Sequence, residues 1–167
     1  MKQLTIVRHA KAEPYEEYAS DFDRPLAPKG LKQIPRIARV LAQLKTPPDW
    51  IISSPAIRAR QTAELLAQEL DFPERILWEE AIYEASAPTL HRILQQTPDT
   101  VTHVLMVGHN PGMERLVAGL CSGNQLMNLR LSTAGTAHLR LEIFQWQQLR
   151  WGSGELRLLL RPGVLKS

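Results

Sequence analysis

Short apolar segments alternate with segments of helical periodicity over the first two thirds of the sequence. The clearest apolar segments are Gln3–Val7, Trp50–Ser53 and Thr102–Val107, with a shorter one at Ile76–Glu80. Helical spacing predicts helices over 28–44, 56–70, 89–96 and from residue 113 to 120. Parallel strands need a long crossover connection, usually a helix. The pattern therefore predicts an α/β fold, a three-layer sandwich in which helices flank a central, mostly parallel sheet.

Two details of this pattern are less regular. Pro35 lies inside the first helical segment, and because proline lacks an N–H and crowds the preceding turn, we expect it to kink that helix or delay its start. The polar stretch Tyr15–Asp23 and the stretch Tyr83–Pro88 are predicted to be loops.

After Gly123 the periodicity changes. Thr136–Phe144 and Leu156–Leu160 are predicted to be strands on either side of a loop, and we expect them to join the edge of the sheet in antiparallel orientation. The sequence has no repeat and no low-complexity linker, so a single domain over residues 1–167 is expected.

Composition narrows the class of protein. Of the 167 residues, 44% are hydrophobic, enough for a sizeable core, and no run is long and apolar enough to cross a bilayer. The first residues lead directly into a strand without a signal-peptide pattern, which favours a cytoplasmic protein. The single cysteine, Cys121, excludes an internal disulfide and is assigned to packing. The net charge of +3 suits an anionic substrate, and no nucleic-acid motif is present.

Cationic and imidazole side chains follow three of the predicted strands. Arg8 and His9 follow the first, Arg58 lies in the first turn of the helix after the second, and His109 follows the strand that ends at 107. Ligands of parallel sheets bind at the carboxyl ends of the strands, where helix N-termini also point. The sequence therefore predicts one pocket with two guanidiniums and two imidazoles, which suits a phosphoryl group.

The chemistry of such a pocket follows from its residue types. Two arginines can hold the phosphoryl oxygens, one neutral imidazole can attack phosphorus, and the second can stabilise charge in the transition state. This chemistry needs no metal or other cofactor. A zinc site is the alternative for two histidines, but the sequence has no H-x-x-x-H or C-x-x-C spacing. His91, His103 and His138 are given no role in the pocket.

Three segments, RHAKAE, SSPAIRARQTAELLA and VGHNPGMERLV, resemble the motifs of the histidine phosphatase superfamily, which includes phosphoglycerate mutases. The segments RPLAPKG and LLRPGVL are similar to those of its SixA-type phosphohistidine phosphatases. The resemblance implies a phosphoglycerate mutase-like fold, with His9 as the phosphorylated nucleophile. It implies that Arg8 and Arg58 bind phosphate and that His109 completes the pocket. Ala10 stands where many members have glycine, and Ala27 where a threonine often caps the next helix.

The general acid is the open question. Larger members of this superfamily use a glutamate, and Glu84 is the nearest candidate here, although it equally fits an ordinary exposed loop carboxylate. Arg24 is a candidate for a further phosphate contact from its loop. Without a firmly placed acid, the weaker P–N bond of phosphohistidine is easier to cleave than the bond to an alcohol.

The expected function is metal-independent hydrolysis of phosphohistidine on a phosphorelay or phosphocarrier protein, through a covalent intermediate. The short connections leave little material for a lid, which suits a protein substrate but also small phosphoesters. The alternatives are a small-molecule phosphomonoesterase or a mutase-like enzyme, and an inactive module that only binds phosphate. We expect no partnership with nucleic acid or membrane.

Overall fold

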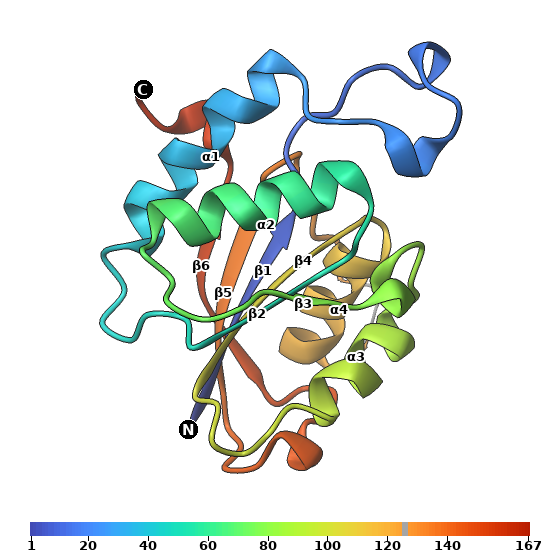
Figure 1. The fold of residues 1–167 in the computed structure, drawn as a ribbon. Helices are drawn as coiled ribbons and strands as arrows, with labels where there is room; N and C mark the ends of the chain where they lie inside the picture. The colour runs from blue at the N-terminus through green and yellow to red at the C-terminus, as the bar shows by residue number, and fades with distance from the viewer. Residues whose placement is uncertain (125–126) are drawn as a thin grey trace.

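The computed structural model describes residues 1–124 and 127–167, and these form a six-stranded sheet with the order β3-β2-β4-β1-β5-β6 (Figure 1). The strands are β1 (Lys2–Arg8), β2 (Trp50–Ser53), β3 (Leu77–Trp78), β4 (His103–Gly108), β5 (Thr136–Leu141) and β6 (Gly154–Leu160). The α-helices are α1 (Pro28–Leu41), α2 (Ile57–Glu69), α3 (Ala87–Gln95) and α4 (Gly112–Ser122). Short 3-10 helices are η1 (Tyr15–Glu17), η2 (Asp21–Asp23), η3 (Glu80–Ile82), η4 (Trp146–Gln148) and η5 (Pro162–Val164).

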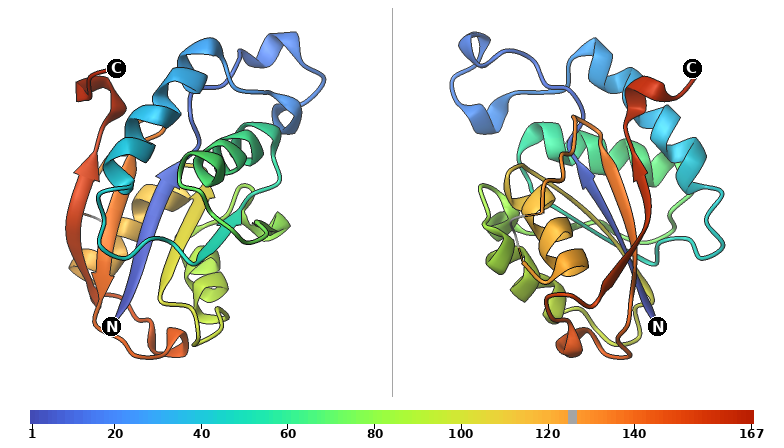
Figure 2. Two further views of the ribbon diagram at one scale, coloured as in Figure 1. Left: turned by 60° about the vertical axis from the view of Figure 1, so that its left-hand side comes forward. Right: turned by 180° about the vertical axis from the view of Figure 1, so that it is seen from behind.

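The helices cover both faces of the sheet, which confirms the predicted three-layer α/β architecture. Helices α1 and α2 lie over one face, and α3 and α4 lie over the other (Figures 1 and 2). Because side chains alternate along a strand, β1 supplies both layers of the core. Leu4 and Ile6 pack with α3 and α4, whereas Val7 packs with α1 and α2.

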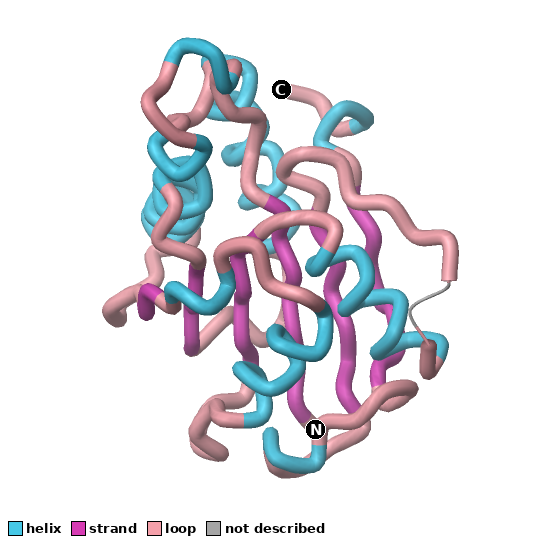
Figure 3. Tube along the Cα trace, turned by 90° about the vertical axis from the view of Figure 1, so that its right-hand side faces the viewer, coloured by secondary structure: helices cyan, strands magenta, loops and turns pink. Residues whose placement is uncertain are grey.

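The register of the strands brings the predicted site together. Strand β4 pairs in parallel with β1 and β2, with Arg8 opposite Gly108 and Ser53 opposite Val107. The carboxyl ends of these three strands therefore reach the same edge of the sheet, and Figure 3 shows the strands side by side. Strand β5 is antiparallel to β1, and β6 is antiparallel to β5, as predicted for the C-terminal segment.

Helix α1 departs from the prediction at Pro35. The helix begins at Pro28 and continues through Pro35 to Leu41, so the expected delay of its start was wrong. Proline removes the donor for the carbonyl of Leu31, four residues earlier. Leu31 lies on the solvent side of the helix and is 48% exposed. The buried face of α1, which includes Ile34 and Ile37, provides the apolar contacts that hold the helix together.

Other boundaries differ by a few residues. Strand β3 is shorter than the predicted Ile76–Glu80, because the chain turns into η3 at Glu80. Helix α3 begins at Ala87 instead of Thr89, since proline is tolerated in a first helical turn and Ser86 caps the helix by accepting from the Thr89 N–H. The predicted loop Tyr15–Asp23 contains two single 3-10 turns, η1 and η2.

Candidate active site

His9 follows β1 in the centre of the sheet, and its ring is held in one orientation. Its Nδ1 lies 2.8 Å from the carbonyl oxygen of Ala10. A carbonyl can only accept, so Nδ1 carries the hydrogen and Nε2 presents its lone pair. That lone pair accepts from Nε of Arg58 at 3.3 Å. Burial lowers the pKa of His9 to about 4. The hydrogen bond to the Ala10 carbonyl raises this pKa, and the charges of the nearby arginines lower it further.

His109 follows β4 and lies beside His9, with ring centroids 5.2 Å apart. Its Nδ1 lies 3.3 Å from Nη2 of Arg58, and because a guanidinium only donates, Nδ1 is the acceptor. The other nitrogen, Nε2, therefore donates to Oγ of Ser54 at 2.9 Å. Burial and the charges of His9 and Arg58 lower the pKa of His109 to about 3. Both imidazoles are neutral at pH 7.

Arg58 joins the two histidines. It lies in the first turn of α2, is only 5% exposed, and contacts both imidazole rings. Thr62, one turn later, accepts from the Ala10 N–H and donates to the Arg58 carbonyl, which ties α2 to the segment after β1. The expected convergence of His9, Arg58 and His109 is thus present in the structure.

Arg8 reaches the same region from the last position of β1. Its Nη1 donates to the Leu131 carbonyl at 3.0 Å. Its Nε is buried and has no acceptor among the described residues. A buried donor of this kind is costly unless an acceptor binds to it, and a phosphoryl oxygen would be suitable.

Arg24 is held by its own loop. It donates twice to Oδ1 of Asp21, at 3.0 and 2.8 Å, and once to the Glu13 carbonyl. Its charge contributes to the lowered pKa of His9, so it lies close enough to affect the pocket. A direct phosphate contact from Arg24 stays a prediction.

Glu84 is exposed, and its carboxylate has no hydrogen bond or ion pair with any described residue. Its backbone has a φ of 55°, in the left-handed region that costs energy for a residue with a side chain. Its charge contributes to the raised pKa of the neighbouring Tyr83. The role of Glu84 as general acid stays a prediction.

Asp21 and Tyr83 were not anticipated as parts of the site. Oδ2 of Asp21 accepts from Nη2 of Arg58 and from the Tyr83 hydroxyl, both at 2.8 Å. The Tyr83 ring stands edge-on to His109, with centroids 5.3 Å apart. Burial raises the pKa of Asp21, but bonds from Tyr83 and Arg24 and the charge of Arg58 outweigh burial and lower it to about 2. No local pattern marks these two residues, because both lie in irregular connections.

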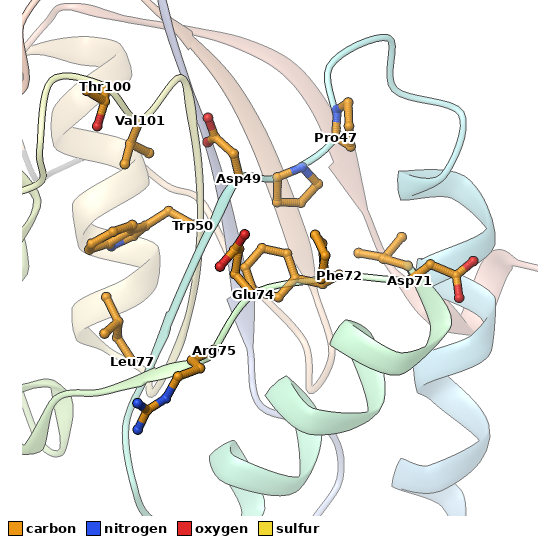
Figure 4. A pocket seen from close by; sticks show the side chains of 13 residues that line it. Pro47, Asp49, Trp50, Asp71, Phe72, Glu74, Arg75, Leu77, Thr100 and Val101 are labelled. Carbon is orange, nitrogen blue, oxygen red and sulfur yellow. The ribbon is translucent and has the colours of Figure 1, made fainter.

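The structure also contains a separate cavity. It has a volume of about 730 Å³, and Trp50, Phe72 and Leu77 contribute to its lining, together with Thr100 and Val101 before β4 (Figure 4). It is therefore at the amino ends of the strands, away from the histidine pair. The described residues contain no group of three or more potential metal ligands, and none of their helices is long and apolar enough to span a membrane.

Comparison with known protein sequences identifies the family of this chain. Residues 4–86 match the sequence model of the histidine phosphatase superfamily (branch 1). A Picosynechococcus protein of uncharacterized function is 32% identical over 141 residues, covering 83% of this chain and 84% of that protein. An uncharacterized protein of Mycobacterium tuberculosis is also 32% identical, over 81% of this chain and 87% of its own length. The chain belongs to the histidine phosphatase superfamily and is a phosphatase of that class.

Within this superfamily the chain is structurally close to SixA. The structure of the protein histidine phosphatase SixA complexed with tungstate superposes with a TM-score of 0.82 and 27% identity. The match covers 96% of this chain and 97% of the SixA chain. The resemblance inferred from the motifs is therefore confirmed.

Proposed function

We propose that this protein hydrolyses phosphohistidine on a protein substrate, with His9 as the covalent nucleophile. The orientation of His9 carries this proposal. Its Nδ1–H is bound to a carbonyl, so the unprotonated Nε2 faces Arg58 and His109. A neutral imidazole held in this tautomer is ready to attack phosphorus without first losing a proton.

The reaction proceeds in two displacements. The Nε2 lone pair of His9 bonds to phosphorus while the substrate P–N bond breaks, and the departing imidazole nitrogen takes a proton from solvent. Water then bonds to phosphorus and returns a proton to solvent. The P–Nε2 bond breaks, and its electron pair returns to Nε2.

The neighbouring cations support both displacements. Arg8 and Arg58 hold the phosphoryl oxygens through charge-assisted bonds, and the Nε of Arg58 moves its hydrogen bond from His9 Nε2 to the phosphoryl group. In the structure Nδ1 of His109 accepts from Arg58, so His109 takes up a proton at Nδ1 as the anionic phosphoryl group binds. It then donates to an equatorial oxygen and stabilises the charge that develops there. Arg24 adds positive charge from the loop. The arginines and histidines perform the charge stabilisation, so the proposed mechanism requires no metal.

The preference for a P–N bond rests on the lack of a firmly held acid. Asp21 is ionised at neutral pH because its pKa is lowered to about 2, and Glu84 is exposed without a described partner. An alkoxide leaving group needs a proton donor, whereas an imidazole can be protonated from solvent. The likeness to SixA supports the same substrate class.

A substrate panel tests the proposal. The intact protein, in excess chelator, is expected to hydrolyse a phosphohistidine peptide with a higher kcat/KM than phosphoserine, phosphotyrosine or sugar phosphates. His9→Ala should remove turnover with little change in melting temperature, and quenching with alkali should trap phosphate on wild type only. Preferred hydrolysis of sugar phosphates would instead indicate a small-molecule phosphomonoesterase. Binding of phosphate without turnover on any substrate would indicate an inactive module.

A further inference from the structure

A second group of histidines lies on the sheet beneath the end of α1, outside the candidate active site. Thr5 on β1 lies opposite His138 on β5, and His103 is on β4, the strand on the other side of β1. The proposed reaction uses none of these three residues. Oγ1 of Thr5 lies 2.7 Å from Nε2 of His103 and 2.9 Å from Nδ1 of His138. Nδ1 of His103 lies 2.8 Å from the carbonyl oxygen of Thr46.

These contacts determine where each hydrogen lies. The Thr46 carbonyl only accepts, so His103 donates through Nδ1. His103 is fully buried and burial lowers its pKa, so it is neutral and its Nε2 accepts from the Thr5 hydroxyl. Thr5 has one hydrogen to give, and therefore Nδ1 of His138 donates to Thr5. This leaves the lone pair on Nε2 of His138.

The Nε2 atom of His138 has no hydrogen-bond partner among the described residues, although the side chain is only 6% exposed. His138 lines a cavity of about 390 Å³, whose other lining residues are Gln3, Leu44, Lys45, Thr46, Arg140, Arg157 and Leu158. The loop after α1 runs beside β5 and β6 at this position (Figure 2). Burial, with the charges of His103 and Arg157, lowers the pKa of His138 to about 4.

The rim of this cavity is cationic. Lys45, Arg140 and Arg157 each contribute a positive charge, and Arg157 is paired at 3.2 Å with the exposed Glu155. Within the described part of the chain, the Nε of Arg140 donates only to Sδ of Met1, a weak acceptor. The pocket therefore attracts an anion, but the lone pair of His138 repels any anion oxygen that carries no hydrogen.

We infer that this cavity is a second oxyanion site that binds inorganic phosphate through its remaining P–OH group, with His138 Nε2 as the acceptor. Lys45, Arg140 and Arg157 bind the other oxygens. Sulfate has no hydrogen at neutral pH and is disfavoured. A phosphomonoester, whose second pKa is about 6, is mostly without this hydrogen above pH 7 and is also disfavoured. This inference is independent of the proposed function.

NMR of the histidine side chains in the full chain at pH 7.5 tests this site. Adding inorganic phosphate is expected to shift the Nε2 resonance of His138 in a saturable way. Sulfate at matched ionic strength should need at least about tenfold higher concentration to give the same shift, which corresponds to a difference in binding free energy of about 1.4 kcal/mol. Methyl phosphate, which has no hydroxyl and whose phosphoryl oxygens are mostly without hydrogen at this pH, is expected to resemble sulfate. The resonances of His9 and His109 report phosphate in the candidate active site separately, so failure at one site does not affect the result at the other.

Two exposed arginines provide the matched variants. Arg140→Gln together with Arg157→Gln should weaken the phosphate response of His138 about tenfold or more without changing turnover. Arg150→Gln, at an exposed position that does not line the cavity, should leave the response unchanged. Equal responses to phosphate and sulfate would overturn the role of His138. No shift of His138, or a shift that the double variant does not weaken, would overturn the site itself.

Discussion

The Arg58 guanidinium contacts Asp21 at two points. Its Nη1 donates to the Asp21 backbone carbonyl at 2.7 Å, and its Nη2 donates to the carboxylate at 2.8 Å. The same guanidinium faces His9 and His109 at 3.3 Å each. The loop that contains Asp21 therefore sets the direction in which Arg58 points. Arg24 donates to Oδ1 of the Asp21 carboxylate, and the Tyr83 hydroxyl donates to Oδ2.

Asp21→Ala is expected to lower the free energy of unfolding by about 1–2 kcal/mol, because a buried guanidinium loses a charge-assisted acceptor that is itself partly solvent-screened. Urea unfolding measures the change. Asp23→Ala is the matched control in the same 3-10 turn, since Asp23 is exposed and, among the described residues, its carboxylate accepts only from Ser20. Equal losses in the two variants would contradict a specific role for Asp21.

The acidic limb of the activity profile should reflect the lowered pKa of His9. Protonation of Nε2 removes the attacking lone pair, so kcat/KM for a P–N substrate should fall as the pH decreases through about 4. An unperturbed histidine would lose activity near its ordinary pKa of 6.5. Initial rates between pH 3.5 and about 8, corrected for uncatalysed hydrolysis, distinguish the two cases. A limb centred near the ordinary value would contradict the neutral, buried nucleophile.

Stability should also decrease in acid. Burial lowers the pKa of each of the five histidines, and those of His9, His109 and His138 reach about 4, 3 and 4. The unfolded chain therefore binds more protons than the folded chain below 6.5. The free energy of unfolding is at its full value above this pH and decreases toward pH 4. Urea titrations at several pH values measure it, and a flat profile across this window would contradict the prediction.

Glu84→Gln tests the general acid. If Glu84 protonates a leaving alcohol, the variant should slow ester hydrolysis by about 10²-fold or more while P–N hydrolysis stays unchanged. Glu80→Gln, at an exposed position in η3, is the control for loss of a nearby negative charge. If neither substrate responds to Glu84→Gln, then Glu84 is an ordinary loop carboxylate.

Helix α1 begins without a side-chain cap, because Ala27 occupies the N-cap position in an extended conformation. Ala27→Thr should stabilise the protein by about 0.5–2 kcal/mol, since the hydroxyl can accept from a free N–H of the first turn. Ala27→Val adds similar bulk without an acceptor and should not stabilise. Thermal unfolding of the two variants compares them, and equal effects would rule out capping as the cause.

Much of the fold could be predicted, because strand and helix periodicity reflects which side chains are buried. The local pattern of apolar residues was enough to predict the strands at 3–7, 50–53 and 102–107 and the antiparallel C-terminal pair. Pro35 was misjudged because packing of α1 against the sheet outweighs a local penalty. The boundary of α3 differed because proline at Pro88 fits the first turn of a helix.

His9, Arg58 and His109 could be placed together from the sequence alone, since each follows a strand and parallel strands end at one edge of the sheet. Asp21 and Tyr83 could not, because no periodicity relates an irregular loop to the residues it contacts. The tautomers of His9, His109 and His138 likewise depend on which partner faces each ring nitrogen. Local sequence determines the order and kind of elements, whereas hydrogen-bond direction and burial arise only when distant segments meet in the folded chain.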